Sequence, residues 1–281
     1  MVFVLDLSKY NNIISTDMRS INDLNEEEIS KLIKSEKEKH TNIYNKFTLL
    51  QKSFIEDGIL SRLFYKKKYV FSITENKEHL IRTNIKVGKS DIVIPLKFVL
   101  VMESILNKDL KVKGLFRKCA NVNDIKKLSE LIESLTEKNY DEIYKKVCKY
   151  DIITCCVFYK TLFSKYKNPI LSSNATTLFT GVITDETDVN KRAIMFRFLI
   201  LGLPRENRML LISLVMFFII IYVESTDNGT DLDARLSIKG LAACIAPQIV
   251  MTSKIKDNNY LRQLVDVISC IFTHFETIFM I

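Results

Sequence analysis

The side chains that could carry out chemistry without a partner are few and widely separated along the chain. The 281 residues include three histidines, His40, His79 and His274. No serine or cysteine can be ordered with them into a nucleophile and base, and no G-x-S-x-G turn is present. The six cysteines form no C-x-x-C pair, so no local spacing supports a zinc site. We therefore expect neither a self-contained hydrolase nor a metal centre.

One short segment has the composition of a phosphate-binding loop. Gly88-Lys89-Ser90 has the order of the end of such a loop, but the glycine required five residues before Gly88 is Thr83. Without that glycine the backbone amides cannot wrap around a phosphate. We expect no nucleotide at this segment and no cofactor held by the chain itself.

The most informative segment is Gly114-Leu115-Phe116-Arg117-Lys118, in which Gly114 follows Pro95 by nineteen positions. This segment resembles the Rho GTPase-activating (RhoGAP) domain. In that family a proline opens a helix, and a "GIFR" loop with the catalytic arginine follows at this same separation. The spacing fits without a gap.

Three further blocks resemble the same family, in the same order. Asp151 to Lys160 is similar to the family's D-x-H-x-V-A-x-L-L-K helix, and Pro169-Ile170-Leu171 falls where P-L-L follows. Leu203-Pro204-Arg205-Glu206-Asn207 matches LP-x-x-N. Leu241-Ala242 with Ala246-Pro247 is similar to N-L-A-x-x-x-A-P-N. Together the blocks indicate a RhoGAP-like domain.

The resemblance implies an activator of a partner's GTP hydrolysis, with no self-contained active site. Arg117 would be the catalytic arginine, inserted into a Rho-family small GTPase that itself holds GTP and Mg²⁺. Lys160 matches the family's GTPase-binding lysine. Lys118 and Gln248 are also expected to bind the partner.

Three residues before Arg117 are expected to support it. Gly114 would let the loop turn tightly, because glycine adopts backbone conformations closed to other residues. Leu115 and Phe116 would be buried in the helical bundle and hold Arg117 outward on a rigid base.

The chain departs from the family pattern at several positions near the expected site. The asparagine before "LA" is Gly240, and the arginine four residues after Lys160 is Ser164. The asparagine of N-x-M is Ala234, Gln248 replaces the last asparagine, and Cys119 occupies a serine position. These losses motivate an alternative function, a module of the same fold that binds a GTPase or other signalling partner without accelerating it.

The elements that must position these residues are expected to be helices. Seven glycines and four prolines are too few for a β-sandwich or barrel. We expect an all-α, RhoGAP-like bundle over residues 86–281 and an N-terminal, partly helical extension over residues 1–85. The expected helices cover residues 95–107, 123–135, 140–147, 152–165, a pair within 173–203, 205–223, 234–246 and 258–279.

The N-terminal extension has weaker signals. Asn22 or Asp23 could cap a helix, and aromatic and β-branched residues between Phe64 and Ile85, such as residues 69–74, could form a short strand or an extended connection. A modest apolar stripe at helical spacing comprises Ile29, Leu32, Ile33, Ile43, Phe47 and Leu50.

Residues 209–223 form a nearly unbroken apolar run that allows two interpretations. A spanning helix needs about 20 such residues, and shorter runs are more typical of buried core helices. Pro204 and Glu206 open the segment as they would open a soluble helix. We expect a core helix, with a membrane anchor as the alternative.

Composition indicates a cytoplasmic protein. The N-terminus lacks the basic start and long apolar core of a secretion signal, and unpaired cysteines suit a reducing compartment. The formal charge of +8 is spread along the chain. A single basic and aromatic patch at residues 65–69 is too little for a nucleic-acid partner, whereas a basic surface is compatible with peripheral association at an anionic membrane.

Overall fold

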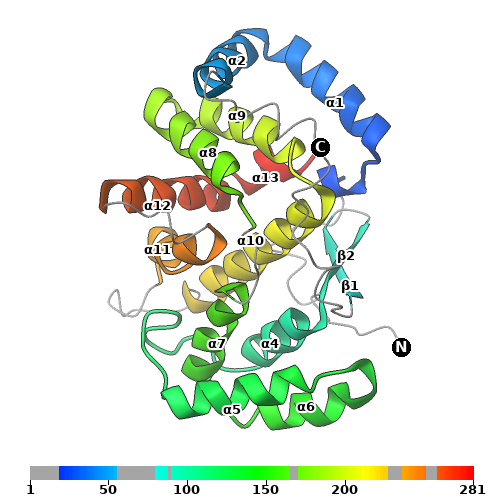
Figure 1. Cartoon of the computed structure of the whole chain (residues 1–281), viewed down its shortest axis with the longest axis vertical. Helices are drawn as coiled ribbons and strands as arrows, with labels where there is room; N and C mark the ends of the chain where they lie inside the picture. The colour runs from blue at the N-terminus through cyan, green and yellow to red at the C-terminus, as the bar shows by residue number, and fades with distance from the viewer. Residues whose placement is uncertain (1–18, 56–79, 88–89, 165–169, 227–235, 251–257) are drawn as a thin grey trace.

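The chain folds into a bundle of helices, as the sequence predicts (Figure 1). The computed structural model describes residues 19–55, 80–87, 90–164, 170–226, 236–250 and 258–281. Within these ranges there are twelve α-helices, two short 3-10 helices and one antiparallel pair of strands. Their bounds in the bundle are α4 Leu96–Leu106, α5 Val122–Glu133, α6 Tyr140–Val147, α7 Ile152–Ser164, α8 Ser173–Asp185, α9 Val189–Leu201, α10 Arg205–Thr226, α11 Ile238–Ile249, α12 Asn258–Thr273 and α13 Phe275–Phe279.

Two of the expected helices differ from the observed ones. The helix expected over residues 234–246 is α11, which begins at Ile238 because the Ser237 side chain accepts the N–H of Gly240 and caps it. The single helix expected over residues 258–279 is divided at His274, whose backbone leaves the helical conformation between α12 and α13. A continuous apolar pattern gave no signal of that break.

Helix α10 forms the centre of the core. It is the one helix in the described residues with the length and apolarity to cross a membrane, yet 72% of its apolar window is buried by the rest of the chain. Its Phe218 ring lies 4.9 Å from that of Phe116 and 6.0 Å from that of Phe272. These contacts favour the core-helix interpretation, because the apolar face is already covered by protein.

Helices α4 and α7 pack against each other beside α10 and define the end of the molecule that carries the arginine segment. The ring of Phe98 lies 4.9 Å from Phe163 and 5.8 Å from Tyr159. Tyr140 at the start of α6 donates a 2.5 Å hydrogen bond to Glu103 of α4. Aromatic packing thus joins α4 to α7, and this polar contact joins α4 to α6.

The N-terminal extension contains two helices, α1 Glu26–Lys39 and α2 Thr41–Ile55. Helix α1 is capped by Asn25, not by Asn22 or Asp23 as expected, because Asn25 and Glu28 exchange side-chain and backbone hydrogen bonds in a capping box. Residues 21–23 form a 3-10 turn instead. The expected apolar stripe is observed: Ile29, Phe47 and Leu50 are buried, and Leu32, Ile33 and Ile43 pack against the core.

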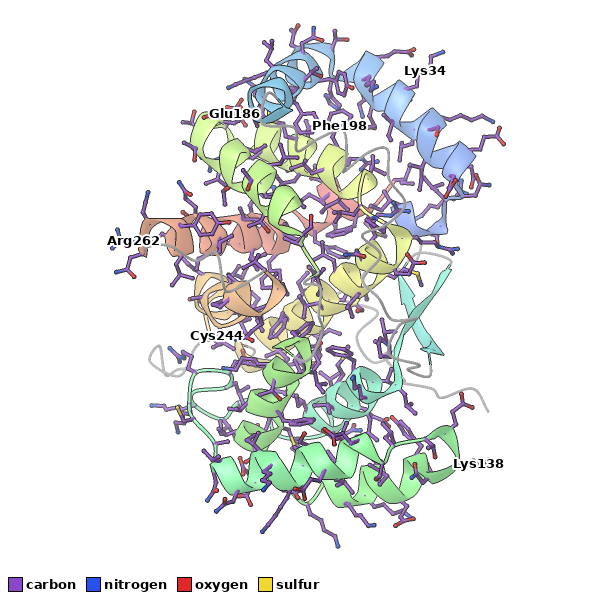
Figure 2. All side chains as sticks on the ribbon, viewed as in Figure 1. Lys34, Lys138, Glu186, Phe198, Cys244 and Arg262 are labelled. Atoms are coloured by element: carbon purple, nitrogen blue, oxygen red, sulfur yellow. The ribbon has the colours of Figure 1, made fainter. Side chains whose placement is uncertain are left out.

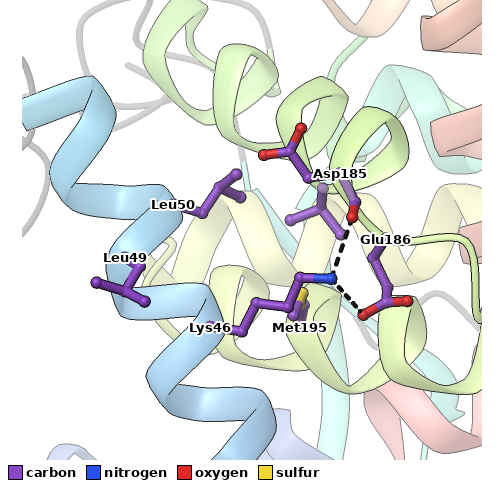
Figure 3. Close-up of a pocket in the computed structure, with 7 residues that line it drawn as sticks. Lys46, Leu49, Leu50, Asp185, Glu186 and Met195 are labelled. Atoms are coloured by element: carbon purple, nitrogen blue, oxygen red, sulfur yellow. Dashed lines mark hydrogen bonds and ion pairs between the residues drawn. The ribbon is translucent and has the colours of Figure 1, made fainter.

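These two helices cover α8 and α9 at the end of the bundle opposite α5 and α6 (Figure 1). The ring of Phe47 stacks on Phe198 of α9 at 5.8 Å. Lys46 bridges to α8, donating to the Asp185 carbonyl at 3.1 Å and to the Glu186 carboxylate at 3.0 Å, beside a cavity of about 270 Å³ (Figure 3). Residues before 86 therefore share the core of the bundle.

The strands β1 Leu80–Val87 and β2 Ser90–Pro95 form an antiparallel hairpin. Residues 80–85 of β1 fall within the segment 64–85, for which a short strand or an extended connection was expected, whereas β2 was not indicated by the sequence. Helix was expected from residue 88 onward, and the boundary expected between residues 85 and 86 falls inside β1. The run Ile92-Val93-Ile94 is short and β-branched, a pattern that favours a strand but cannot be told from a helix by periodicity alone. The strand expected at residues 69–74 lies outside the described residues.

Candidate functional site

Residues 107–121 connect α4 to α5 and contain the arginine segment; we call this connection the arginine loop. The carbonyl of Gly114 accepts hydrogen bonds from the N–H groups of Arg117 at 3.0 Å and Lys118 at 2.9 Å. Gly114 has a φ of +86°, and a Cβ added there would lie 2.7 Å from the Lys118 side chain. Both observations require glycine at this position.

The two residues before Arg117 anchor the loop in the core. Leu115 is 1% exposed and Phe116 is fully buried. The Phe116 ring packs edge-on against Phe217 and Phe218 of α10, at 6.3 and 4.9 Å. Phe116 also has a φ of +61°, a left-handed conformation that costs a non-glycine residue about 1–2 kcal/mol. Burial of the ring, worth about 1.5–3 kcal/mol, offsets that cost.

Lys160 of α7 holds the loop from the other side. Its ammonium donates a 2.6 Å hydrogen bond to the carbonyl of Phe116, the residue directly before Arg117. The side chain is half-buried. The sequence indicated a role for Lys160 toward a partner only, and nothing in the spacing of Lys160 and Phe116, 44 positions apart, pointed to this bond.

Arg117 itself is exposed. Among the described residues its guanidinium has no hydrogen-bond or ion-pair partner, and Lys118 and Cys119 beside it are also exposed. A cation with five fixed donors is thus presented outward from a loop whose base is buried and hydrogen-bonded. That arrangement suits insertion of Arg117 into an anionic site on another molecule.

Helix α11 lies next to Arg117. Burial raises the pKa of the Cys244 thiol, and the nearby positive charges of Lys160 and Arg117 oppose that rise. Gly240 and Gln248 are four residues before and after Cys244, so the three share one side of the helix. We call Gly240, Cys244 and Gln248 the α11 stripe. Figure 2 labels Cys244 on this helix, and Gln248 is half-buried.

The match to known proteins covers this whole arrangement. The model of the RhoGAP domain matches residues 95–254, more than half of the chain. The chain belongs to the RhoGAP domain family. Membership confirms the family that the four sequence blocks indicated. It implies that the partner is a Rho-family GTPase. Pro95, at the start of the match, is the N-cap of α4, as a helix-opening proline requires.

Solved structures of RhoGAP domains are similar to this RhoGAP domain in fold. Human Rho GTPase activating protein 15 superposes with a TM-score of 0.55 at 18% identity, covering 66% of this chain and 83% of that one. The BH domain from GRAF, the GTPase regulator associated with focal adhesion kinase, gives 0.52 at 14% identity, covering 65% and 92%. No curated protein sequence matches.

The LP-x-x-N block has a structural role in this RhoGAP domain. Asn207 is buried and donates a 2.7 Å hydrogen bond to the carbonyl of Ile170, which joins α10 to the chain before α8. Arg208 donates to the carbonyls of Leu201 and Leu203 and secures the turn between α9 and α10. Of the expected departures, Ala234 and the side chain of Ser164 lie outside the described residues.

Proposed function

We propose that the chain activates GTP hydrolysis by a Rho-family small GTPase and that Arg117 is the arginine it inserts. The observation that supports this most is the contrast within the arginine loop. Arg117 is exposed and without a described partner, whereas Leu115 and Phe116 before it are buried and Lys160 binds the Phe116 carbonyl. A loop that only connected two helices would have no need of so rigid a base for one exposed cation.

The chemistry follows from charge. In GTP hydrolysis negative charge is spread over the oxygens of the transferring phosphoryl group, and a small GTPase alone lacks enough positive charge beside them. An arginine supplied in trans is worth about 10³–10⁵ in rate, or roughly 4–7 kcal/mol of the activation barrier. The planar guanidinium of Arg117 can donate two parallel hydrogen bonds in a fixed fork, a geometry that the three donors of an ammonium do not reproduce.

The other residues contribute to binding and presentation. Lys160 keeps the Phe116 carbonyl fixed and thereby orients Arg117, and its remaining donors can reach a carboxylate or carbonyl of the partner. Lys118 and Gln248 contact the GTPase on either side of Arg117. GTP and Mg²⁺ are held by the partner, and the activity belongs in the cytoplasm, where the basic surface also permits peripheral association with an anionic membrane.

A second candidate function is favoured by Gly240. The family has an asparagine at this position, one helical turn before Cys244, whose thiol feels the charge of Arg117, and Gly240 supplies no side-chain amide there. With the arginine unsupported on that side, the chain could bind a GTPase without accelerating it, because an angstrom of misplacement can cost about a hundredfold in rate.

One assay separates the two functions. The full chain is added to a panel of GTP-loaded Rho-family GTPases, and single-turnover hydrolysis and binding affinity are both measured. We expect acceleration for at least one member, abolished in Arg117→Ala with affinity for that member largely retained. Binding without acceleration across the panel would contradict the proposal in favour of the binding-only module.

A further inference from the structure

A groove of about 490 Å³ lies beside α5, outside the region around Arg117. Helix α5 forms one side, and the end of α6 with the turn that leads into α7 forms the other, along the lower edge of the molecule in Figure 1. It is lined by Lys127, Glu130, Leu131, Lys146, Lys149 and Tyr150.

The groove combines an apolar floor with a basic rim. Leu131 and Tyr150 are partly buried and pack against the core. Lys146 is paired with Glu142 at 2.5 Å. The side chains of Lys127 and Lys149 are exposed, and neither ammonium has a hydrogen-bond or ion-pair partner among the residues that the structure describes. Two lysines are thus available to an incoming acidic group.

The groove is close to the arginine loop along α5. This helix begins at Val122, five residues after Arg117, and Lys127 lies five residues further on. At about 1.5 Å per residue, Lys127 is roughly 8 Å along the helix from Val122. A protein of GTPase size covers about 800 Å² of its partner, an area roughly 30 Å across. Five residues of chain span at most about 18 Å, so one interface of this width can include both Arg117 and the Lys127 end of the groove.

The start of α5 is also unusual in its exposure. Val122 is 80% exposed, compared with 66% for Leu49 and 50% for Val189. The Asn121 side chain accepts the N–H of Asn123 and holds this first turn in place. An exposed apolar side chain thus marks the end of α5 that follows the arginine loop.

We propose that this groove is the outer part of the partner-docking surface and receives an acidic segment of the GTPase that carries an apolar side chain. The inference rests on the proposed function. Leu131 and Tyr150 accept the apolar side chain, and Lys127 and Lys149 pair with the flanking carboxylates. A concave groove with an apolar floor suits a peptide segment better than a flat lipid bilayer, which would require lysines projecting from a flat or convex face.

The test compares two charge-reversal variants of the full chain on a responsive GTPase. Lys127→Glu/Lys149→Glu changes the groove, and Lys34→Glu/Lys39→Glu makes the same change in net charge on α1, at the far end of the molecule (Figure 2 labels Lys34). We expect the groove variant to raise the concentration for half-maximal acceleration about tenfold with the maximal rate within about twofold of wild type. The α1 variant should change neither, and thermal melting confirms that both fold.

Each outcome separates this inference from the proposed function. An unchanged half-maximal concentration in the groove variant overturns the inference, while acceleration by the wild type still supports the proposed function. If the wild type binds GTPases without accelerating them, the dissociation constant is compared instead, and no loss of affinity overturns the inference. If the wild type binds no GTPase, both fail. If the groove variant loses binding to phosphatidylserine vesicles but keeps its affinity for the GTPase, the groove binds a membrane and the inference is overturned.

Discussion

The arginine loop and the α11 stripe lie next to each other, but the interactions that hold them differ. On the loop, Phe116 is buried against α10 and its carbonyl is bound by Lys160. On α11, Gly240 has no side chain, and within the described residues neither Cys244 nor Gln248 has a side-chain hydrogen bond. Packing and a hydrogen bond within the chain hold the loop in the absence of a partner. The α11 stripe has no side chain at Gly240 that could hydrogen-bond a guanidinium.

This difference teaches that presenting an arginine and orienting it against a phosphate are separate tasks. The loop accomplishes the first through packing and one hydrogen bond, both within the chain. The second needs polar groups aimed at Arg117, and the position where the family has an asparagine holds Gly240. We therefore expect variants of the loop to cause the largest losses and variants of the stripe to cause gains.

The largest effect is expected for Arg117→Lys. A single ammonium cannot reproduce the two parallel donors of the guanidinium, so the maximal stimulated rate should fall about 10³-fold, nearly as far as in Arg117→Ala. Single-turnover hydrolysis at saturating concentration of the chain measures this. A loss smaller than tenfold would mean that Arg117 acts through its charge alone.

Phe116→Ala should damage both the loop and the fold. Removing a fully buried ring leaves a cavity against Phe217 and Phe218 and should lower the free energy of unfolding by about 3–5 kcal/mol. Urea denaturation measures the loss, and Phe116→Leu is the matched control with a smaller expected effect. A fall below about 1 kcal/mol for alanine would show that the loop is not anchored by this ring.

Lys160→Met keeps the length of the side chain and removes the hydrogen bond to Phe116. If Lys160 acts mainly through the loop, the maximal rate should fall about 10–100-fold while affinity for the GTPase changes only a few fold. Lys160→Arg should restore part of the rate, since a guanidinium can also donate to the carbonyl. A loss confined to affinity would instead assign Lys160 to direct contact with the partner.

Gly240→Asn is expected to give a smaller change in the opposite direction. A Cβ at this position would lie 3.1 Å from the Ser237 hydroxyl that caps α11, so this hydroxyl must shift by a few tenths of an ångström to admit the asparagine. An amide beside Arg117 should raise the maximal rate up to about tenfold, less than the 10²–10³ contributed by a donor that is fully oriented. Gly240→Ala controls for the added Cβ and should give no gain; an equal gain in both variants would exclude the amide as the cause.

Local sequence signals were sufficient for most of the fold. Helices α6 and α7 and the buried interior of α10 follow from apolar spacing, whereas the arginine loop was predicted from its resemblance to the family's "GIFR" segment at the same distance from Pro95. The break at His274 and the hairpin ending at Pro95 did not follow, because short apolar runs are compatible with either helix or strand.

The contacts that support the site depend on packing between distant segments. The bond from Lys160 to the Phe116 carbonyl joins residues 44 positions apart, and the left-handed φ of Phe116 is imposed by burial of its ring, not by its residue type. Likewise, no local sequence pattern indicated that the Phe47 ring would stack on Phe198. These features required the structure because no local pattern encodes which surfaces meet.

Arg197 of α9 contacts both the C-terminal residues and helix α1. It donates to the carbonyls of Thr277 and Met280 and lies 3.7 Å from the Glu36 carboxylate of α1. The N–H of Ile281 donates to the carbonyl of Arg19 at 2.7 Å, and the C-terminus lies beside α1, away from the arginine loop (Figure 1). A surface tether attached after Ile281 would therefore leave Arg117 facing solution.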